Sequence, residues 1–283
     1  MDTLKGRSFE HREIRSPEIS RIDTGSIKDT LPTIGGTDIT LQRHGDYIRS
    51  PEHESVGSLT PEAREEVTAM VRQKVNALLK DADQEANVAF LVTGSATRHY
   101  GKGQRSIETA EIVREEISRA LSEHGMRADL LLNNRSARKG VAPIKKVRAP
   151  QFVDTMNPYF EFLLGKHDAQ MGEAFWKDFE SDTYKQEREA FCAEGPDDID
   201  QRFTRHIKAL KRFASSFHQD NAGHRLIIWN VSHYDTIAPF AKRHIDHSDK
   251  DIHLPVELGG GLTLEIRGAE VTTELCGHLY TVT

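Results

Sequence analysis

The sequence predicts an α/β fold, a three-layer α/β/α sandwich built on a mostly parallel sheet. Short apolar runs alternate with amphipathic helical segments along the chain, which is the pattern of strands joined by helical crossovers. Three of the apolar runs end in clusters that contain histidine, serine or glycine, as parallel strands sharing one ligand-binding edge would. A polar N-terminal extension and a largely helical insertion are added to this pattern.

The domain organisation follows from where the pattern starts and where it is interrupted. Residues 1–36 carry few large apolar side chains and many charged ones, which indicates an extended arm outside the core. We therefore expect one domain over residues 37–283. Within it, residues 135–195 are expected to form a helical insertion or lid.

Composition excludes several classes of protein. The net charge of −6 over 283 residues argues against a nucleic-acid binder that works by bulk electrostatics. The two cysteines, Cys192 and Cys276, lie far apart, which favours a reducing compartment. No apolar run is long enough to span a membrane, and residues 1–21 lack the apolar core of a secretion signal. We expect a soluble cytoplasmic protein; no feature indicates an oligomeric state.

The first strand is expected to end at an unusual polar sequence. Residues 39–42 alternate between Ile or Leu and Thr or Gln, which suits a buried strand, and Arg43-His44-Gly45 follows. Gly45 frees the backbone to turn and leaves room for a ligand to approach the main chain. Taken alone, these residues also fit a surface arginine and a satisfied histidine at a turn.

The remaining elements follow in chain order. Thr60 is a good N-cap and Pro61 suits the first helical position, which places a helix over 61–80. Further elements are predicted as a strand at 87–95, a helix at 105–125, a strand at 128–134, a helix at 198–218, a strand from 225 to His233, and a hairpin or sheet edge within 256–275.

Three strand ends carry polar clusters that a parallel sheet would bring to one edge. They are residues 43–45, 93–95 and 231–233. A cleft with two histidines and at least two arginines is a cationic pocket that suits a phosphoryl group, because guanidinium binds phosphate oxygens in a bidentate fork. A neutral histidine can attack phosphorus, and a protonated one can stabilise the transition state.

Four segments, taken in order, resemble the histidine phosphatase superfamily, which includes the cofactor-dependent phosphoglycerate mutases. They are LQRHGDY, SLTPEARE, RSIETAEIV and VSHYDTI, and the resemblance covers roughly residues 37–128 and 225–270. The resemblance implies a phosphomonoesterase of the histidine acid phosphatase type. It also implies that neither a metal nor an organic cofactor is required.

The resemblance assigns roles residue by residue. It implies that His44 becomes the phosphohistidine, that Arg43 and Arg105 bind the phosphate, and that His233 is the second imidazole. Arg98 is the rival of Arg105. The run ATRHYGKGQ, which separates Ser95 from Arg105, either pushes Arg105 out of the family's usual turn or adds a loop at the pocket rim.

The general acid is where the sequence departs from the family. The stretch after the predicted third strand has no carboxylate between Asp129 and Asp154, although the family carries its acid there. The candidates are Asp154, Glu161 and Asp235, of which we favour Asp154. The loop DYIRSPEHESVGS also replaces the Asn-rich run of the mutases, which favours a phosphatase over a mutase.

The histidine-rich run HIDHSDKDIH, residues 244–253, lacks a fixed-spacing ligand motif. We interpret it as a solvated loop and predict no metal site.

The sequence thus predicts a phosphomonoester hydrolase that acts through a phosphohistidine on a phosphorylated small molecule or protein. Three alternatives stay open: a weak or inactive phosphate-binding module, a phosphohistidine protein phosphatase, and a phosphoglycerate mutase-type phosphotransferase. The first is motivated by the missing acid and the N-terminal arm.

Overall fold

The computed structural model describes residues 36–50, 52–80, 88–98, 102–132, 141–154, 157–245, 258–268, 270–275 and 278–282. Its centre is a seven-stranded sheet in the order β3-β2-β4-β1-β5-β6-β7. The strands are β1 (Thr37–Arg43), β2 (Val88–Ser95), β3 (Ala142–Ile144), β4 (Arg225–Ser232), β5 (Gly261–Arg267), β6 (Glu270–Leu275) and β7 (His278–Thr281).

The sheet has a parallel half and an antiparallel half. β3, β2, β4 and β1 run parallel to one another, and β5, β6 and β7 are added antiparallel beside β1. The α/β sandwich predicted from the sequence is confirmed. The predicted arm, apart from Gly36, lies outside the described residues.

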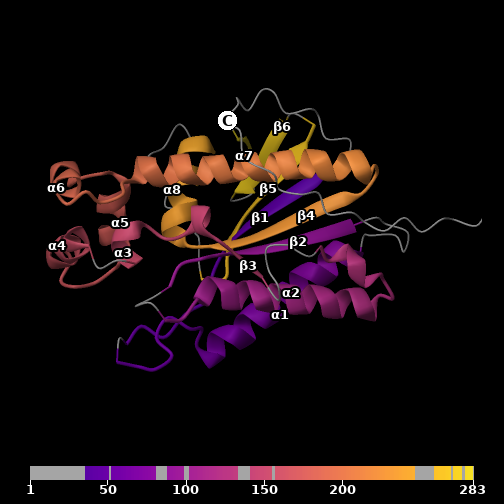
Figure 1. Ribbon diagram of the computed structural model, residues 1–283, viewed down its shortest axis with the longest axis horizontal. Helices are drawn as coiled ribbons and strands as arrows, with labels where there is room; N and C mark the ends of the chain where they lie inside the picture. Colours follow the sequence, from indigo (N-terminus) through magenta and orange to yellow (C-terminus); the bar gives the residue numbers. More distant parts are fainter. Residues whose placement is uncertain are drawn as a thin grey trace, which may run out of the picture.

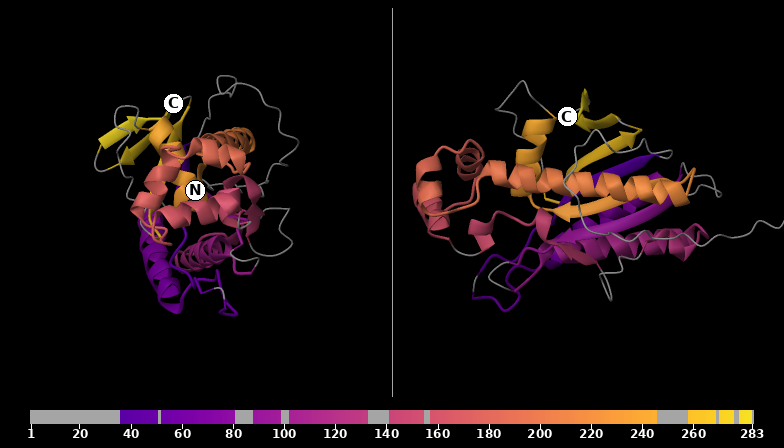
Figure 2. Two further views of the ribbon diagram at one scale, coloured as in Figure 1. Left: turned by 90° about the vertical axis from the view of Figure 1, so that its left-hand side faces the viewer. Right: turned by 45° about the horizontal axis from the view of Figure 1, so that its top comes forward.

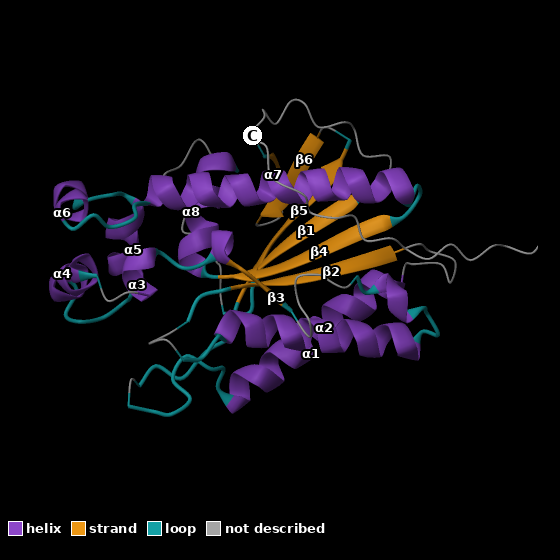
Figure 3. Ribbon diagram, viewed as in Figure 1, coloured by secondary structure: helices purple, strands orange, loops and turns teal. Residues whose placement is uncertain are grey.

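Helices cover both faces of the sheet and gather at one end of it (Figure 1). One face carries α1 and α2, and the other carries α7 and α8; the end view at the left of Figure 2 shows these layers on opposite sides of the sheet. Four short helices, α3 to α6, lie beyond the ends of the parallel strands (Figure 3). The bounds are α1 (Pro61–Lys80), α2 (Arg105–Glu123), α3 (Gln151–Asp154), α4 (Pro158–Lys166), α5 (Glu173–Glu180), α6 (Lys185–Ala190), α7 (Pro196–Asp220) and α8 (Tyr234–His244), with 3-10 turns η2 (Ala128–Leu130) and η3 (Lys145–Val147).

Alternation along the strands divides the core into separate clusters. In β2, Phe90 and Val92 face α1 and α2, whereas Ala89 and Leu91 face α7 and α8. Side chains of a strand point to opposite faces in turn, so one buried strand serves both layers. The short helices enclose a third cluster of their own, rich in phenylalanine and including Phe152 and Phe179.

Several predicted elements are confirmed and one is wrong. The Thr60 side chain accepts from the Ala63 backbone N–H at 3.1 Å, so the predicted cap forms. The strand predicted over 128–134 is wrong in its described part, residues 128–132, which forms η2 and, through Leu131, a single bridge to Phe90. Leu131 is buried against the α1–α2 layer. The run of leucines at this point of the sequence therefore reflects burial in the core rather than strand pairing.

The third parallel strand is instead β3, which lies inside the segment predicted to be a helical insertion. It pairs with the end of β2, with Thr93 opposite Ala142. The rest of that segment, from Gln151 to Ala190, is largely helical, as predicted. Helix α8 and strand β7 were not predicted from the sequence.

Each helix in the described part of the chain is too short or too polar to cross a lipid bilayer.

The start of β5 sets a first prediction, because Gly261 lies directly against β1. A Cβ atom added there would overlap the carbonyl oxygen of Leu41 and come 2.8 Å from the Gln42 Cα. Gly261→Ala should therefore lower the free energy of unfolding by about 1–3 kcal/mol, since overpacking forces backbone movement. The measurement is urea unfolding.

The matched control is Gly165→Ala in α4, where an added Cβ would meet nothing within 4 Å. This change should leave the protein as stable or add up to about 1 kcal/mol, because alanine favours the helix. Equal effects of the two substitutions would contradict the close approach of β5 to β1.

Candidate functional site

His44 is held by the backbone on both sides at the end of β1. The backbone N–H of His44 donates to the Ser232 carbonyl at 3.1 Å, and the backbone carbonyl of His44 accepts from the Gly259 N–H at 3.2 Å. Gly45 follows, and its φ is not positive, so the backbone there does not need glycine for a left-handed conformation. Its missing side chain instead makes room for α1, because an added Cβ would come 2.9 Å from Val67.

The hydrogen bonds of the His44 ring assign its tautomer. Nδ1 lies 2.6 Å from the Gly45 carbonyl oxygen, which can only accept, so Nδ1 carries the proton. The Arg105 Nε–H donates to Nε2 at 3.0 Å, so Nε2 holds a lone pair. Burial and the Arg105 guanidinium hold the pKa of His44 well below its usual range, so the ring is neutral.

Arg105 reaches the site from the first position of α2. Its backbone N–H donates to the Gly57 carbonyl at 3.0 Å, and its guanidinium lies 4.2 Å from the centre of the Tyr47 ring. The side chain is buried. The run ATRHYGKGQ therefore does not push Arg105 out of the site. Its rival, Arg98, is exposed and does not line the cavity described below.

His233 lies beside His44, with 4.9 Å between the ring centres. Arg105 Nη2 approaches its Nδ1 at 3.4 Å, and its Nε2 lies 3.0 Å from Ser95 Oγ and 3.1 Å from Ser106 Oγ. Because guanidinium only donates, we assign the proton to Nε2. Burial, then Arg105, lowers the pKa of His233 well below its usual range.

Arg43 completes the cationic cluster from the last position of β1. Its guanidinium lies 5.5 Å from the centre of the Tyr234 ring, on the first turn of α8. Burial lowers the pKa of Arg43, and the Asp235 carboxylate acts in the opposite direction. The sheet edge thus concentrates cationic and imidazole groups next to one buried carboxylate.

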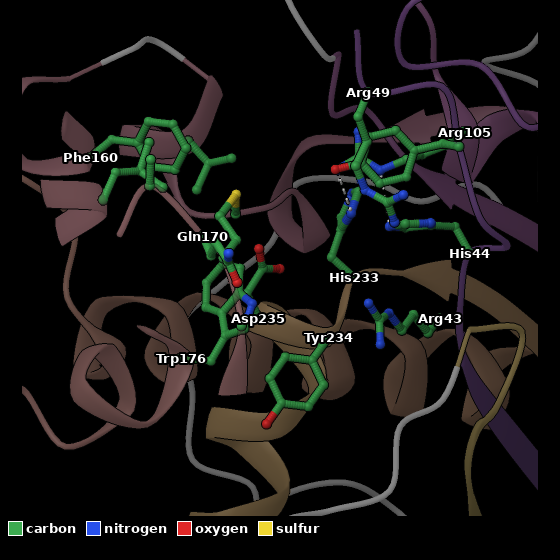
Figure 4. Close-up of a pocket in the computed structure, with 16 residues that line it drawn as sticks. Arg43, His44, Arg49, Arg105, Phe160, Gln170, Trp176, His233, Tyr234 and Asp235 are labelled. Atoms are coloured by element: carbon green, nitrogen blue, oxygen red, sulfur yellow. Dashed lines mark hydrogen bonds between the residues drawn. The ribbon is translucent and has the colours of Figure 1, made fainter. Parts of the chain in front are cut away.

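These side chains open into a cavity of about 550 Å³. Figure 4 shows Arg43, His44 and Arg105 on one side, Phe160 and Trp176 on the other, and Asp235 between them in this view. The lining residues are Arg43, His44, Tyr47, Arg49, Arg105, Val153, Phe160, Leu164, Ala169, Gln170, Met171, Gly172, Trp176, His233, Tyr234 and Asp235.

The four residues that the resemblance assigned to the phosphate site are therefore brought together. Of the candidate acids, Asp235 lines the cavity and is buried, whereas Glu161 is exposed and does not line it. Asp154 ends α3, and its side chain lies outside the described residues, so its role stays a prediction.

Ser106 is the polar partner of the site that was not predicted from the sequence. It directly follows Arg105, and that position in the first turn of α2 is the signal that points to it.

In the described part of the chain, no three His, Cys, Asp or Glu side chains are grouped so that they could hold a metal ion. Most of the histidine-rich run, residues 246–253, lies outside the described residues.

Comparison with solved structures identifies the fold. The structure is similar to phosphoglycerate mutase from Bacillus anthracis, with 17% identity over 88% of this chain and 95% of that chain, at a TM-score of 0.51. It is also similar to a mycobacterial glucosyl-3-phosphoglycerate phosphatase in complex with VO3 (10% identity, 84% and 97% covered, TM-score 0.43).

A putative alpha-ribazole-5'-P phosphatase from Escherichia coli is similar too (17%, 84% and 95%, TM-score 0.40). No protein-family model and no curated protein matches the sequence. The likeness to phosphoglycerate mutase shows that this chain has the fold of that group, so the resemblance is confirmed at the level of fold.

The two neutral imidazoles lead to a prediction about acid stability. Their folded-state pKa lies below the value near 6.5 of an exposed histidine, so their contribution to stability is full above pH 6.5. It is lost as the pH falls below 6.5, because the unfolded chain then binds protons that the folded protein excludes. Each residue should contribute a slope of up to about 1.4 kcal/mol per pH unit.

His44→Gln should therefore make the free energy of unfolding depend less steeply on pH between about 6.5 and 5. Urea unfolding at a series of pH values measures this slope. The control is His124→Gln, whose side chain is exposed in the folded protein. Parallel slopes for wild type and His44→Gln would show that His44 is not buried as a neutral ring.

Proposed function

We propose that this protein is a phosphomonoester hydrolase that works through a phosphohistidine on His44. The observation that carries the proposal is the lone pair on His44 Nε2, fixed by the Gly45 carbonyl and the Arg105 guanidinium inside a cationic cavity. A neutral imidazole whose free nitrogen faces a phosphate site is a competent nucleophile.

The phosphoryl group binds between Arg43, Arg105 and His233. Guanidinium donors form charge-assisted hydrogen bonds to phosphate oxygens, of about 1.5–3 kcal/mol each. Arg105 donates to His44 Nε2. A bound phosphate takes over these N–H groups and leaves the lone pair free to attack. The dianion also favours protonation of His233, whose positive charge then stabilises the equatorial oxygens.

The reaction has two balanced steps. In the first, the bond between His44 Nε2 and phosphorus forms, the ester P–O bond breaks, and the leaving oxygen takes a proton. In the second, water attacks phosphorus and the P–N bond breaks. A proton of that water passes to the side chain that protonated the leaving oxygen in the first step, and this side chain now acts as the base. Inorganic phosphate and the alcohol are the products.

Asp235 is the carboxylate that best fits the role of that acid and base. It is buried, it lines the cavity, and it lies on the first turn of α8, two residues after His233. A proton donor must lie within hydrogen-bond reach of the leaving oxygen, directly or through one water. Asp154 remains the competing candidate, as the sequence favoured it.

The presence of a buried carboxylate in the cavity favours turnover over the alternative of an inactive phosphate-binding module. The loop sequence after Gly45 favours a phosphatase over a phosphoglycerate mutase-type enzyme. A phosphohistidine protein phosphatase is the variant in which the acid matters least, because a neutral imidazole leaves phosphorus readily.

The first test is turnover of a generic aryl phosphate without added metal. His44→Ala should remove nearly all activity, because it removes the proposed nucleophile. The control, His124→Ala, changes an exposed histidine outside the cavity and should retain full activity. A His44→Ala variant that keeps most of the wild-type rate would disprove the mechanism.

The second test separates the candidate acids by their leaving groups. Asp235→Asn should lower kcat on an alkyl phosphate by about 10²–10⁴-fold, since the alkoxide needs a proton, and much less on a nitrophenyl ester. Asp154→Asn is tested alongside it, with Glu161→Gln as the exposed control. If Asp154→Asn shows this dependence on the leaving group and Asp235→Asn does not, the acid is Asp154.

A further inference from the structure

The cavity has two chemically unlike ends. The end opposite the phosphate site is a wall of apolar side chains that all come from the segment between α3 and α5. These are Val153 of α3, Phe160 and Leu164 of α4, Met171 of the following loop, and Trp176 of α5.

Within the described lining, the cationic side chains lie at the other end of the cavity (Figure 4). Among the described residues that line the cavity, the cations are Arg43, Arg49 and Arg105. Arg49 already pairs with Asp46 at 2.5 Å. Gln170, an uncharged polar residue, also lines the cavity at the apolar end. Asp235 lies between the two ends (Figure 4).

The wall is held in place by packing. Phe160 lies 6.1 Å from Phe175 between ring centres, within the phenylalanine-rich cluster of the short helices. Trp176 lies 4.9 Å from Phe175 and 6.2 Å from Tyr234, so the wall is fixed to the helix that carries Asp235. A rigid apolar surface binds an apolar group without having to be ordered first.

We propose that the substrate is a monoester of a single phosphate with an apolar alcohol or phenol. Its phosphoryl group lies at Arg43 and Arg105, and its organic group lies on the wall of Phe160, Leu164 and Trp176. This inference rests on the proposed function. A second phosphate or a carboxylate on the organic group would meet the wall and the Asp235 carboxylate, where no described cation receives it.

A series of straight-chain alkyl phosphates tests the wall, because ethyl, butyl and hexyl esters have nearly the same leaving-group chemistry. kcat/KM should rise about three- to fourfold for each added methylene until the wall is covered. Calorimetric binding of the corresponding alkylphosphonates, which are not hydrolysed, should show the same increase in affinity.

Two substitutions at one exposed position test the charge pattern. Met171 is 36% exposed and lines the cavity, so it accepts a charge without disturbing the core. Met171→Arg should raise kcat/KM for an ω-carboxyalkyl phosphate relative to the alkyl ester by about two- to fivefold, the effect of a surface ion pair. Met171→Asp should lower the same ratio. The control, Phe191→Arg, alters an exposed apolar residue that directly follows α6 and lies outside the cavity.

The two assays separate the inference from the proposed function. Suppose that kcat/KM is equal for all chain lengths and that the Met171 variants leave the ratio of carboxyalkyl to alkyl ester unchanged. This result would overturn the proposed substrate class but would leave the proposed phosphatase function intact. Absence of turnover on every ester, with alkylphosphonates that bind more tightly as the chain lengthens, would overturn the phosphatase and keep the ligand class. Phosphonates that bind equally, without turnover, would overturn both.

Discussion

The parallel pairing of β1 with β4 is the constraint on which the site depends. Arg43 lies opposite Ser232 in register, and the His44 N–H continues the ladder by donating to the Ser232 carbonyl. This register brings His44 next to His233, with 4.9 Å between the rings. A shift of one residue would turn either side chain to the other face of the sheet, since side chains alternate. The positions of His44 and His233 are therefore fixed by the backbone hydrogen bonds of the sheet rather than by a bond between the two rings.

A buried cluster of arginines and histidines is unfavourable unless its charges are compensated. Two aromatic rings contribute to that compensation: Tyr47 lies under the Arg105 guanidinium and Tyr234 under that of Arg43. The histidines respond by staying neutral, because burial and Arg105 lower their pKa. A dianionic ligand would relieve both effects, since it pairs with the guanidinium groups and favours the protonated imidazole. Under the proposed function, the same electrostatics that keeps His44 neutral also favours binding of a phosphoryl group.

The parts that the sequence predicted well are those set by local pattern. Alternation in β1, the near-continuous apolar run of β2, the Thr60 cap and the apolar run before His233 are local signals, and all four produce the expected structure. The strand expected over 128–134 failed because burial alone gives the same run of leucines, and strand pairing depends on where β3 reaches the edge of β2. The general acid could not be chosen from the sequence, because candidates far apart along the chain differ only in their distance from the phosphate.

The division of the cavity between sheet and insertion separates chemistry from recognition. The short helices α3 to α6 pack around the phenylalanine-rich cluster, to which α7 adds Ile199. They touch the site through the contact of Trp176 with Tyr234, which joins the apolar wall to the helix that carries Asp235. Side chains of the wall can therefore change without moving His44 or Arg105, which belong to β1 and α2. Substrate preference is thus expected to follow the helices α3 to α5, whereas the phosphoryl-transfer step follows the register of the sheet.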